Sequence, residues 1–234
     1  MRQKNLTNFN RKSGLIDWLS NLTIIGQLIL INVIFSLIGF VLFSLNKMDY
    51  VALNPNNIVQ GKFLWTLITH MFVHGSPFHL FINMIALYSL GSLSEKIIGR
   101  KRFIWLYLLS GIFAGLLSTI LPLLYGNTFI GERIIGSPSV YMVGASGAIF
   151  AIAGLFVMLL PKLRFMIIFL PFFSLPAYVM IPAVLFITWL AAIAGNFPIG
   201  NVAHLGGFLA GIAYGYYLKK KYKRKVIMIQ RMFR

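Results

Sequence analysis

The feature that most constrains this chain is the alternation of long apolar runs with short clusters of charged residues. Of its 234 residues, 59% are hydrophobic and only 11% are charged, whereas roughly a quarter are charged in an ordinary soluble domain. Apolar runs of this length are typical of bilayer-crossing helices, because hydrocarbon solvates neither charges nor unpaired backbone groups. The sequence therefore predicts an all-α polytopic membrane protein with six spans, over residues 22–45, 77–94, 103–122, 145–160, 165–193 and 203–218.

Local signals refine these spans. Ser76 followed by Pro77 predicts a helix N-cap and first turn at the start of span two. The outer loop 46–76 that precedes it is apolar and aromatic from Phe63 to Val73, so we expect this loop to lie in the outer interface, packed on the bundle.

Span five contains three prolines, Pro171, Pro176 and Pro182. Each removes a backbone donor and clashes with the preceding turn. We therefore expect span five to be a kinked or partly broken helix.

The distribution of positive charge predicts the orientation. Eighteen of the 21 Lys and Arg residues fall on one side of the six spans, and this excess marks the cytoplasmic side. Both termini are then cytoplasmic, as a basic segment over residues 1–21 and a basic tail over 219–234. The net charge of +17 is thereby explained as a topology signal with attraction to anionic lipid, rather than as a nucleic-acid-binding surface.

Several chemistries are excluded by composition. The chain has no cysteine and only four acids, Asp17, Asp49, Glu95 and Glu132, all in loops or at span ends. A buried aspartate pair and a thiol nucleophile are therefore absent. His70 and His74 are four residues apart but lack the glutamate of a zinc-protease helix, so we predict no metal site and no cofactor, and a role for both histidines in folding the outer loop.

Four polar residues from three spans fall at one predicted depth. Ser146 and His204 each lie 15 residues, about 22 Å of helix, above the inner end of their spans, and His79 and Asn83 of span two lie at a similar level. Polar groups inside a membrane are functional candidates by default.

Small residues predict how two of these spans meet. The stripe formed by Gly207, Gly211 and Gly215 shares a helix face with His204, and the start of span four contains Gly144 and Gly147. Such residues let helices approach closely, so Ser146 and His204 are expected to face each other.

A serine beside a histidine base is the arrangement of a nucleophilic hydrolase. Without a carboxylate, the imidazole must be oriented by packing, for which Phe150 is the candidate, or by a backbone or side-chain acceptor. The backbone N–H of Ser146, together with His79 and Asn83, could then stabilise an oxyanion.

These motifs together resemble the rhomboid intramembrane serine proteases of the minimal six-span prokaryotic type. The residues that carry the resemblance are Gly144-x-Ser146-Gly147, Ala203-His204-x-x-Gly207-x-x-x-Gly211 and His79-x-x-x-Asn83, preceded by His70 and His74. The resemblance implies Ser146 as nucleophile, His204 as general base, and His79, Asn83 and the Ser146 N–H as the oxyanion hole.

The resemblance also implies single-pass transmembrane proteins as substrates, and a cell-membrane location with the site opening to the extracytoplasmic side. Span five and the loop 194–202 would be the substrate gate. Two positions depart from the family pattern: Thr66 stands where arginine is common and Phe150 where tyrosine is common.

Two other readings stay open at this point. A non-proteolytic escort of the same family would lack the serine or the histidine, and both are present. A small-solute transporter would account for the prolines of span five, but the sequence shows neither repeats nor acids in the membrane. The sequence does not indicate an oligomeric state.

Overall fold

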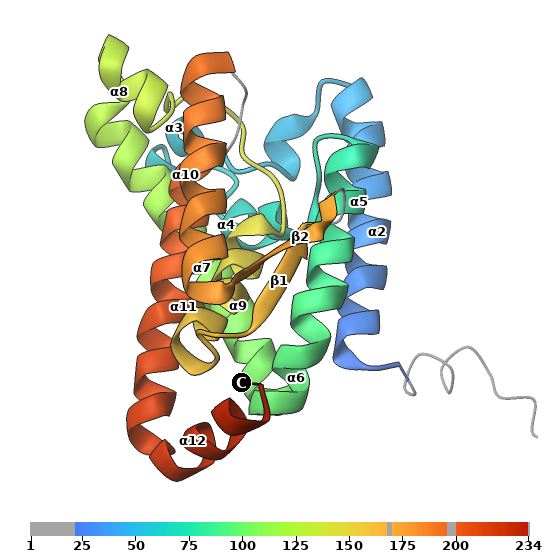
Figure 1. Cartoon of the computed structure of the whole chain (residues 1–234). Coiled ribbons are helices and arrows are strands. Elements are labelled where there is room, and N and C mark those ends of the chain that lie inside the picture. The colour runs from blue at the N-terminus through green and yellow to red at the C-terminus, as the bar shows by residue number, and fades with distance from the viewer. Residues whose placement is uncertain (1–21, 168–169, 196–199, 234) are drawn as a thin grey trace, which may run out of the picture.

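The computed structural model describes residues 22–167, 170–195 and 200–233 and shows a bundle of helices (Figure 1). Its long helices are α2 (Ile24–Ser44), α7 (Arg100–Tyr125), α9 (Ser146–Leu159), α10 (Ala177–Gly195) and α11 (Asn201–Lys221). Shorter elements are η1 (Met48–Tyr50), α3 (Pro55–Val59), α4 (Thr66–Thr69), η2 (His70–Phe72), α8 (Phe129–Ile134) and α12 (Lys223–Met232). The predicted N-terminal basic segment, residues 1–21, lies outside the described residues.

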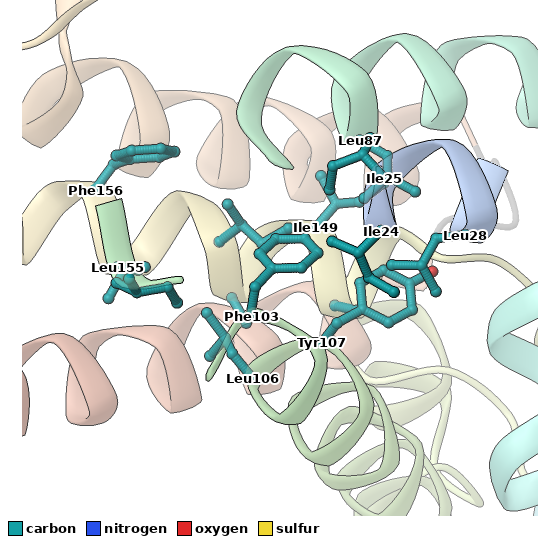
Figure 2. Packing of buried hydrophobic residues seen from close by; sticks show 14 of the residues in the cluster. Ile24, Ile25, Leu28, Leu87, Phe103, Leu106, Tyr107, Ile149, Leu155 and Phe156 are labelled. Atoms are coloured by element: carbon teal, nitrogen blue, oxygen red, sulfur yellow. The ribbon is translucent and has the colours of Figure 1, made fainter. Parts of the chain in front are cut away.

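Helix α9 is the centre of the bundle. Nearly all of its residues are buried, and it packs against both α7 and α11. Figure 2 shows the core around it, where Ile149 of α9 lies beside Phe103 of α7, while Phe156 lies further along α9; all three belong to one buried apolar cluster. The helix that begins with Ser146 is therefore fixed on several sides by apolar packing.

The glycine stripe of α11 lies directly against α9. A side chain at Gly207 would overlap the carbonyl of Gly147, and one at Gly211 would overlap the carbonyl of Ala151. The two backbones are thus in contact, as small residues at membrane helix interfaces allow. This packing places the start of α11 beside the start of α9.

The predicted span two begins where its capping signal indicates. The Ser76 side chain accepts a hydrogen bond from the His79 N–H at 3.1 Å, and Pro77 is the first residue of α5. The helical path continues through α5 (Pro77–Ala86), a π-helical turn η3 (Leu87–Gly91) and α6 (Ser92–Ile98), a few residues beyond the predicted end.

The predicted start of span five is wrong. Instead of a helix from residue 165, the chain forms an antiparallel hairpin of β1 (Arg164–Ile167) and β2 (Leu170–Pro176), in which Arg164 pairs with Pro176 and Met166 with Ser174. Two prolines five residues apart cannot both be accommodated in a regular helix interior, whereas a strand edge or end tolerates them. The helix α10 begins only at Ala177, and Pro182 lies inside it.

An all-α fold is therefore corrected to a mainly helical one with a small hairpin. Within the described part of the chain, α2, α7 and α10 are long and apolar enough to cross a membrane. The number of spans and the side on which the termini lie stay predictions. The loop 194–202, expected at the gate, is described only at its two ends.

The predicted basic tail over 219–234 contains a helix. Residues from Lys223 form the amphipathic helix α12, which turns back beneath the bundle (Figure 1). The Gln230 side chain donates a hydrogen bond to the Leu159 carbonyl at 2.9 Å. This bond satisfies one of the carbonyls left unpaired at the end of α9.

Candidate active site

Ser146 and His204 are in hydrogen-bond contact. Ser146 is the first residue of α9, His204 lies in the first turn of α11, and Ser146 Oγ is 2.8 Å from His204 Nε2. The contact exists because the glycine of α11 one turn later, Gly207, lies against Gly147. The serine hydroxyl can donate to Nε2 in the tautomer that carries its proton on Nδ1.

The ring of His204 is held by stacking. It lies 4.5 Å from the ring of Phe150, centroid to centroid, with an interplanar angle of 28°. The His204 side chain is 9% exposed, and its Nδ1 is buried with no hydrogen-bond partner in the part of the chain that the structure describes. Packing against one aromatic side chain thus orients the imidazole, and no carboxylate of the described residues is hydrogen-bonded to it.

The turn before Ser146 contains a glycine that the local geometry requires. Gly144 has φ +125°, a conformation that side chains rarely adopt, and a Cβ there would lie 2.9 Å from Cε1 of His79. His79 therefore sits directly against the turn that presents Ser146. The Gly144 N–H donates to the His70 carbonyl at 2.9 Å, which ties the same turn to the outer loop.

Asn83 lies one turn beyond His79 on α5, and its side chain is 6% exposed. Its amide donates to the His79 carbonyl at 3.1 Å. The described hydrogen bonds join neither His79 nor Asn83 to Ser146. The structure thus brings His79 against the turn at Gly144 that precedes Ser146, and it places Asn83 one helical turn after His79 on α5.

His74 has a direct part in this site, which sequence reasoning did not find. Its Nε2 accepts a hydrogen bond from the Ala145 N–H at 3.4 Å, so Nδ1 carries the proton and donates to Ser36 Oγ at 3.0 Å. The rings of His74 and His79 meet edge to face at 5.0 Å. Ser36 lies in the middle of the apolar span 22–45. This buried hydroxyl was the sequence signal that could have indicated a polar partner such as His74.

Burial keeps the two loop histidines neutral. Desolvation lowers the pKa of His74 to about 3, with a smaller contribution from His79, and it lowers the pKa of His70 to about 4. His70 Nδ1 donates to the Thr66 carbonyl at 2.8 Å. Thr66 is buried and donates its hydroxyl to the Phe63 carbonyl at 2.7 Å. It stands at the position where arginine is common in the family that the chain resembles.

A second polar network fastens the outer loop to the segment before Ser146. The carboxylate of Asp49 accepts from the Tyr141 hydroxyl at 2.7 Å and from the Asn57 amide at 2.6 Å. Leu53 and Met142 exchange backbone hydrogen bonds nearby. The hydrogen bond to Asp49 raises the pKa of Tyr141. Within the described ranges, no three His, Asp or Glu side chains form a group that could hold a metal ion.

Comparison with known proteins supports the resemblance. The model of the Rhomboid domain family matches residues 61–221. The chain is 30% identical over 168 residues to Rhomboid protein 1, mitochondrial, of Saccharomyces cerevisiae, covering 68% of this chain and 43% of that protein. It is 31% identical over 183 residues to the human Presenilin-associated rhomboid-like protein, mitochondrial, covering 77% and 45%.

A plant relative is equally similar. The RHOMBOID-like protein 1 of Arabidopsis thaliana is 31% identical over 174 residues, which cover 74% of this chain and 39% of that protein. The chain thus spans less than half the length of these curated relatives.

Proposed function

The chain belongs to the rhomboid family, and we propose that it is an intramembrane serine endopeptidase that uses Ser146 as nucleophile and His204 as general base. The observation that carries this proposal is the 2.8 Å contact between Ser146 Oγ and His204 Nε2. The substrates proposed are single-pass transmembrane proteins, cut within or near their membrane segment. The presence of both residues in contact favours an active enzyme over a non-proteolytic escort.

The geometry supports a two-step acyl transfer. Nε2 of His204 takes the hydroxyl proton as Ser146 Oγ attacks the peptide carbonyl carbon, and the resulting imidazolium returns this proton to the leaving amine. An ester to Ser146 remains. A water molecule, deprotonated by His204, then attacks the ester and releases the new carboxyl end and the serine hydroxyl.

The oxyanion formed in each step needs fixed donors. The Ser146 N–H belongs to the first turn of α9 and has no intrahelical partner, and it lies at the positive end of the helix dipole. The imidazole of His79 is already against this turn at Gly144. Asn83 can contribute its second amide hydrogen, since the first is used by the His79 carbonyl.

In the bilayer we propose six spans with both termini in the cytoplasm, and a site that opens to the extracytoplasmic side of the cell membrane. The asymmetry of Lys and Arg supports this orientation. The yeast and human relatives are named mitochondrial proteins, so cell fractionation is the experiment that distinguishes the two membranes for this chain. We propose α10, with the hairpin before it, as the gate through which a substrate enters.

The test is cleavage of a transmembrane reporter by the purified protein in liposomes. Ser146→Ala and His204→Ala are expected to reduce cleavage by at least roughly 10³-fold. Ser118→Ala is the matched control, because Ser118 is also buried in the bundle and its hydroxyl has no partner among the described residues. Undiminished cleavage by Ser146→Ala would refute the mechanism.

A serine-directed fluorophosphonate tests whether the reactivity of Ser146 depends on His204. Labelling should be confined to Ser146 and should require His204. An escort would bind the reporter without cutting it and without being labelled.

A further inference from the structure

A pocket of about 160 Å³ lies beneath the bundle, between α12 and the ends of α6, α7, α9 and α11. Its apolar wall includes Ile98, Leu159, Leu218 and Val226, all buried. Helix α12 thus covers the end of the core without filling the space beneath it.

The polar part of the pocket is cationic. Arg102, Tyr222 and Lys225 are its polar lining residues, and no acidic side chain of the described residues lines it. The Arg102 guanidinium donates to the Tyr222 hydroxyl at 2.9 Å and lies 5.0 Å from the centre of the Tyr222 ring. Arg102 is therefore held at the mouth of the pocket with further N–H groups free to bind an anion.

We propose that this pocket binds one anionic phospholipid, with its phosphate on Arg102 and Lys225 and an acyl segment against the apolar wall. In the proposed orientation the pocket lies at the cytoplasmic headgroup level, where basic pockets between helices bind anionic headgroups. The charge complementarity selects an anionic lipid over a zwitterionic one, and the apolar wall selects a lipid over a soluble phosphate. The lipid would brace α12 against the bundle.

The test is native mass spectrometry of the intact protein extracted from vesicles of equal phosphatidylglycerol and phosphatidylcholine. The wild type is expected to retain one phosphatidylglycerol in preference to phosphatidylcholine. Arg102→Gln with Lys225→Gln should lower this retention about tenfold, and so should Val226→Phe, which fills the pocket without changing charge.

The matched control is Lys220→Gln with Arg224→Gln, which removes the same charge from exposed positions outside the lining and should retain the lipid. Equal loss in this control would overturn the proposal in favour of a diffuse electrostatic attraction. Equal retention of both lipids, or displacement by glycerol phosphate, would overturn it as well. These measurements do not depend on proteolysis.

A separate observation concerns two unpaired polar atoms in the candidate active site. His204 Nδ1 and Asn201 Oδ1 are both buried with no hydrogen-bond partner among the described residues, and the two residues are three positions apart on α11. Their side chains are 9% and 6% exposed. In the tautomer that the Ser146 contact requires, His204 Nδ1 carries a proton and is a donor, whereas Asn201 Oδ1 is an acceptor. Residues three apart on a helix lie on the same face, so the two atoms can be hydrogen-bond partners.

We infer that Asn201 is a positioning residue for the base, which accepts the His204 Nδ1–H directly or through one water molecule. This inference rests on the proposed function. It would hold the tautomer in which Nε2 faces Ser146, the task of the third group in serine hydrolases. The other groups facing His204 are Ser146 and Phe150 from α9 and the titratable His79 from α5.

The test compares the pH dependence of cleavage in Asn201→Leu and Asn201→Asp. Loss of one hydrogen bond should lower kcat about tenfold in Asn201→Leu, with KM unchanged. A carboxylate at this position would stabilise the imidazolium, so the acidic limb of kcat/KM should move to higher pH in Asn201→Asp. Asn56→Asp adds the same charge in the outer loop and should not move the limb.

A purely structural role would lower the unfolding temperature of both variants and leave the limb in place, and this result would overturn the inference. Failure of the proposed function looks different, because then the wild type does not cut or Ser146→Ala cuts equally well.

Discussion

Gly207 of α11 lies so close to the carbonyl of Gly147 in α9 that no side chain fits between the two backbones. Gly147 directly follows Ser146, and Gly207 is three residues after His204. The contact between the two glycines therefore sets the distance between the two groups proposed to carry the chemistry.

Gly207→Ala should consequently abolish cleavage while the protein still folds. The added methyl group must separate α11 from α9, which costs about 1–3 kcal/mol for overpacking and moves His204 away from Ser146. Cleavage kinetics and thermal unfolding in detergent measure the two effects. In the control Gly26→Ala, the added Cβ would meet only ordinary contacts at 3.5 Å or more, so cleavage and unfolding temperature should both stay unchanged. A fully active Gly207→Ala would show that the contact between Gly207 and Gly147 does not position the dyad.

The stacking of Phe150 on His204 leads to a graded prediction. Phe150→Ala removes the stacked ring, and an aromatic pair contributes about 0.5–1.5 kcal/mol, so kcat should fall up to roughly tenfold. Phe150→Tyr keeps the ring and should remain near wild type. Equal losses in the two variants would contradict a role for stacking, because Phe150→Tyr keeps the stacked ring.

Burial of His74 predicts how stability depends on pH. The pKa of His74 is about 3 in the folded protein and about 6.5 in an unfolded chain, so between these values the unfolded state binds more protons. Stability is therefore fully present above about pH 6.5 and is lost as the pH falls toward 3. His70, with a pKa of about 4, adds to this loss.

The measurement is the unfolding temperature of wild type and His74→Gln between pH 4 and pH 8. The variant should be less stable at pH 8, where it lacks the ring contacts, and the difference should shrink as the pH falls. Parallel curves would contradict the neutral, buried state of His74. The rate of cleavage by His74→Gln at pH 8 should also fall, because the Ala145 N–H, next to Ser146, loses the His74 ring as its acceptor.

Asp49 should control the mobility of the outer loop. Asp49→Ala removes the shared acceptor of Tyr141 and Asn57, and a buried or half-buried donor left unpaired costs about 1–3 kcal/mol. Hydrogen exchange over residues 46–62 should accelerate. Tyr141→Phe should give a smaller effect. Lys62→Ala should give none, because the Lys62 side chain donates only to Gln60 among the described residues. Unchanged exchange in Asp49→Ala would show that the backbone bonds of Leu53 and Met142 suffice.

The absence of cysteine makes the proposed orientation directly measurable. Single cysteines can be introduced at Lys47 and Lys162 without removing any native thiol. A membrane-impermeant maleimide applied to intact cells should label the cysteine at 47 and should reach the one at 162 only after permeabilisation. Labelling of both from outside would contradict the six-span arrangement.

Much of the helical framework follows from local sequence. The capping residues Ser76 and Pro77 fix the start of α5, and the stripe that includes Gly207 indicates the partner of α11. These signals are strong because each depends on residues close together in the chain. The juxtaposition of Ser146 with His204 could be predicted only by adding a depth argument to this stripe.

Other features depend on partners that sequence does not specify. The run from residue 165 to residue 173 is apolar throughout, so periodicity cannot separate a buried strand from a helix, and the prolines at 171 and 176 indicated only a break. The role of His74 comes from a backbone N–H 71 residues away. In α12 the spacing of Val226 and Ile229 is an amphipathic signal, which the prediction did not use because it treated the segment only as a cluster of positive charge.

The length of α9 has a consequence for where a substrate is cut. With 14 residues, α9 measures about 21 Å, or about 9 Å less than a hydrocarbon core of about 30 Å. If α9 ends at the inner boundary, its first residue, Ser146, lies about six helical residues below the outer one. The length of α9 then sets the depth at which a substrate is cut, so the scissile bond lies in the first or second turn of the substrate's membrane segment. Lengthening that segment at its cytoplasmic end should leave the cut site unchanged.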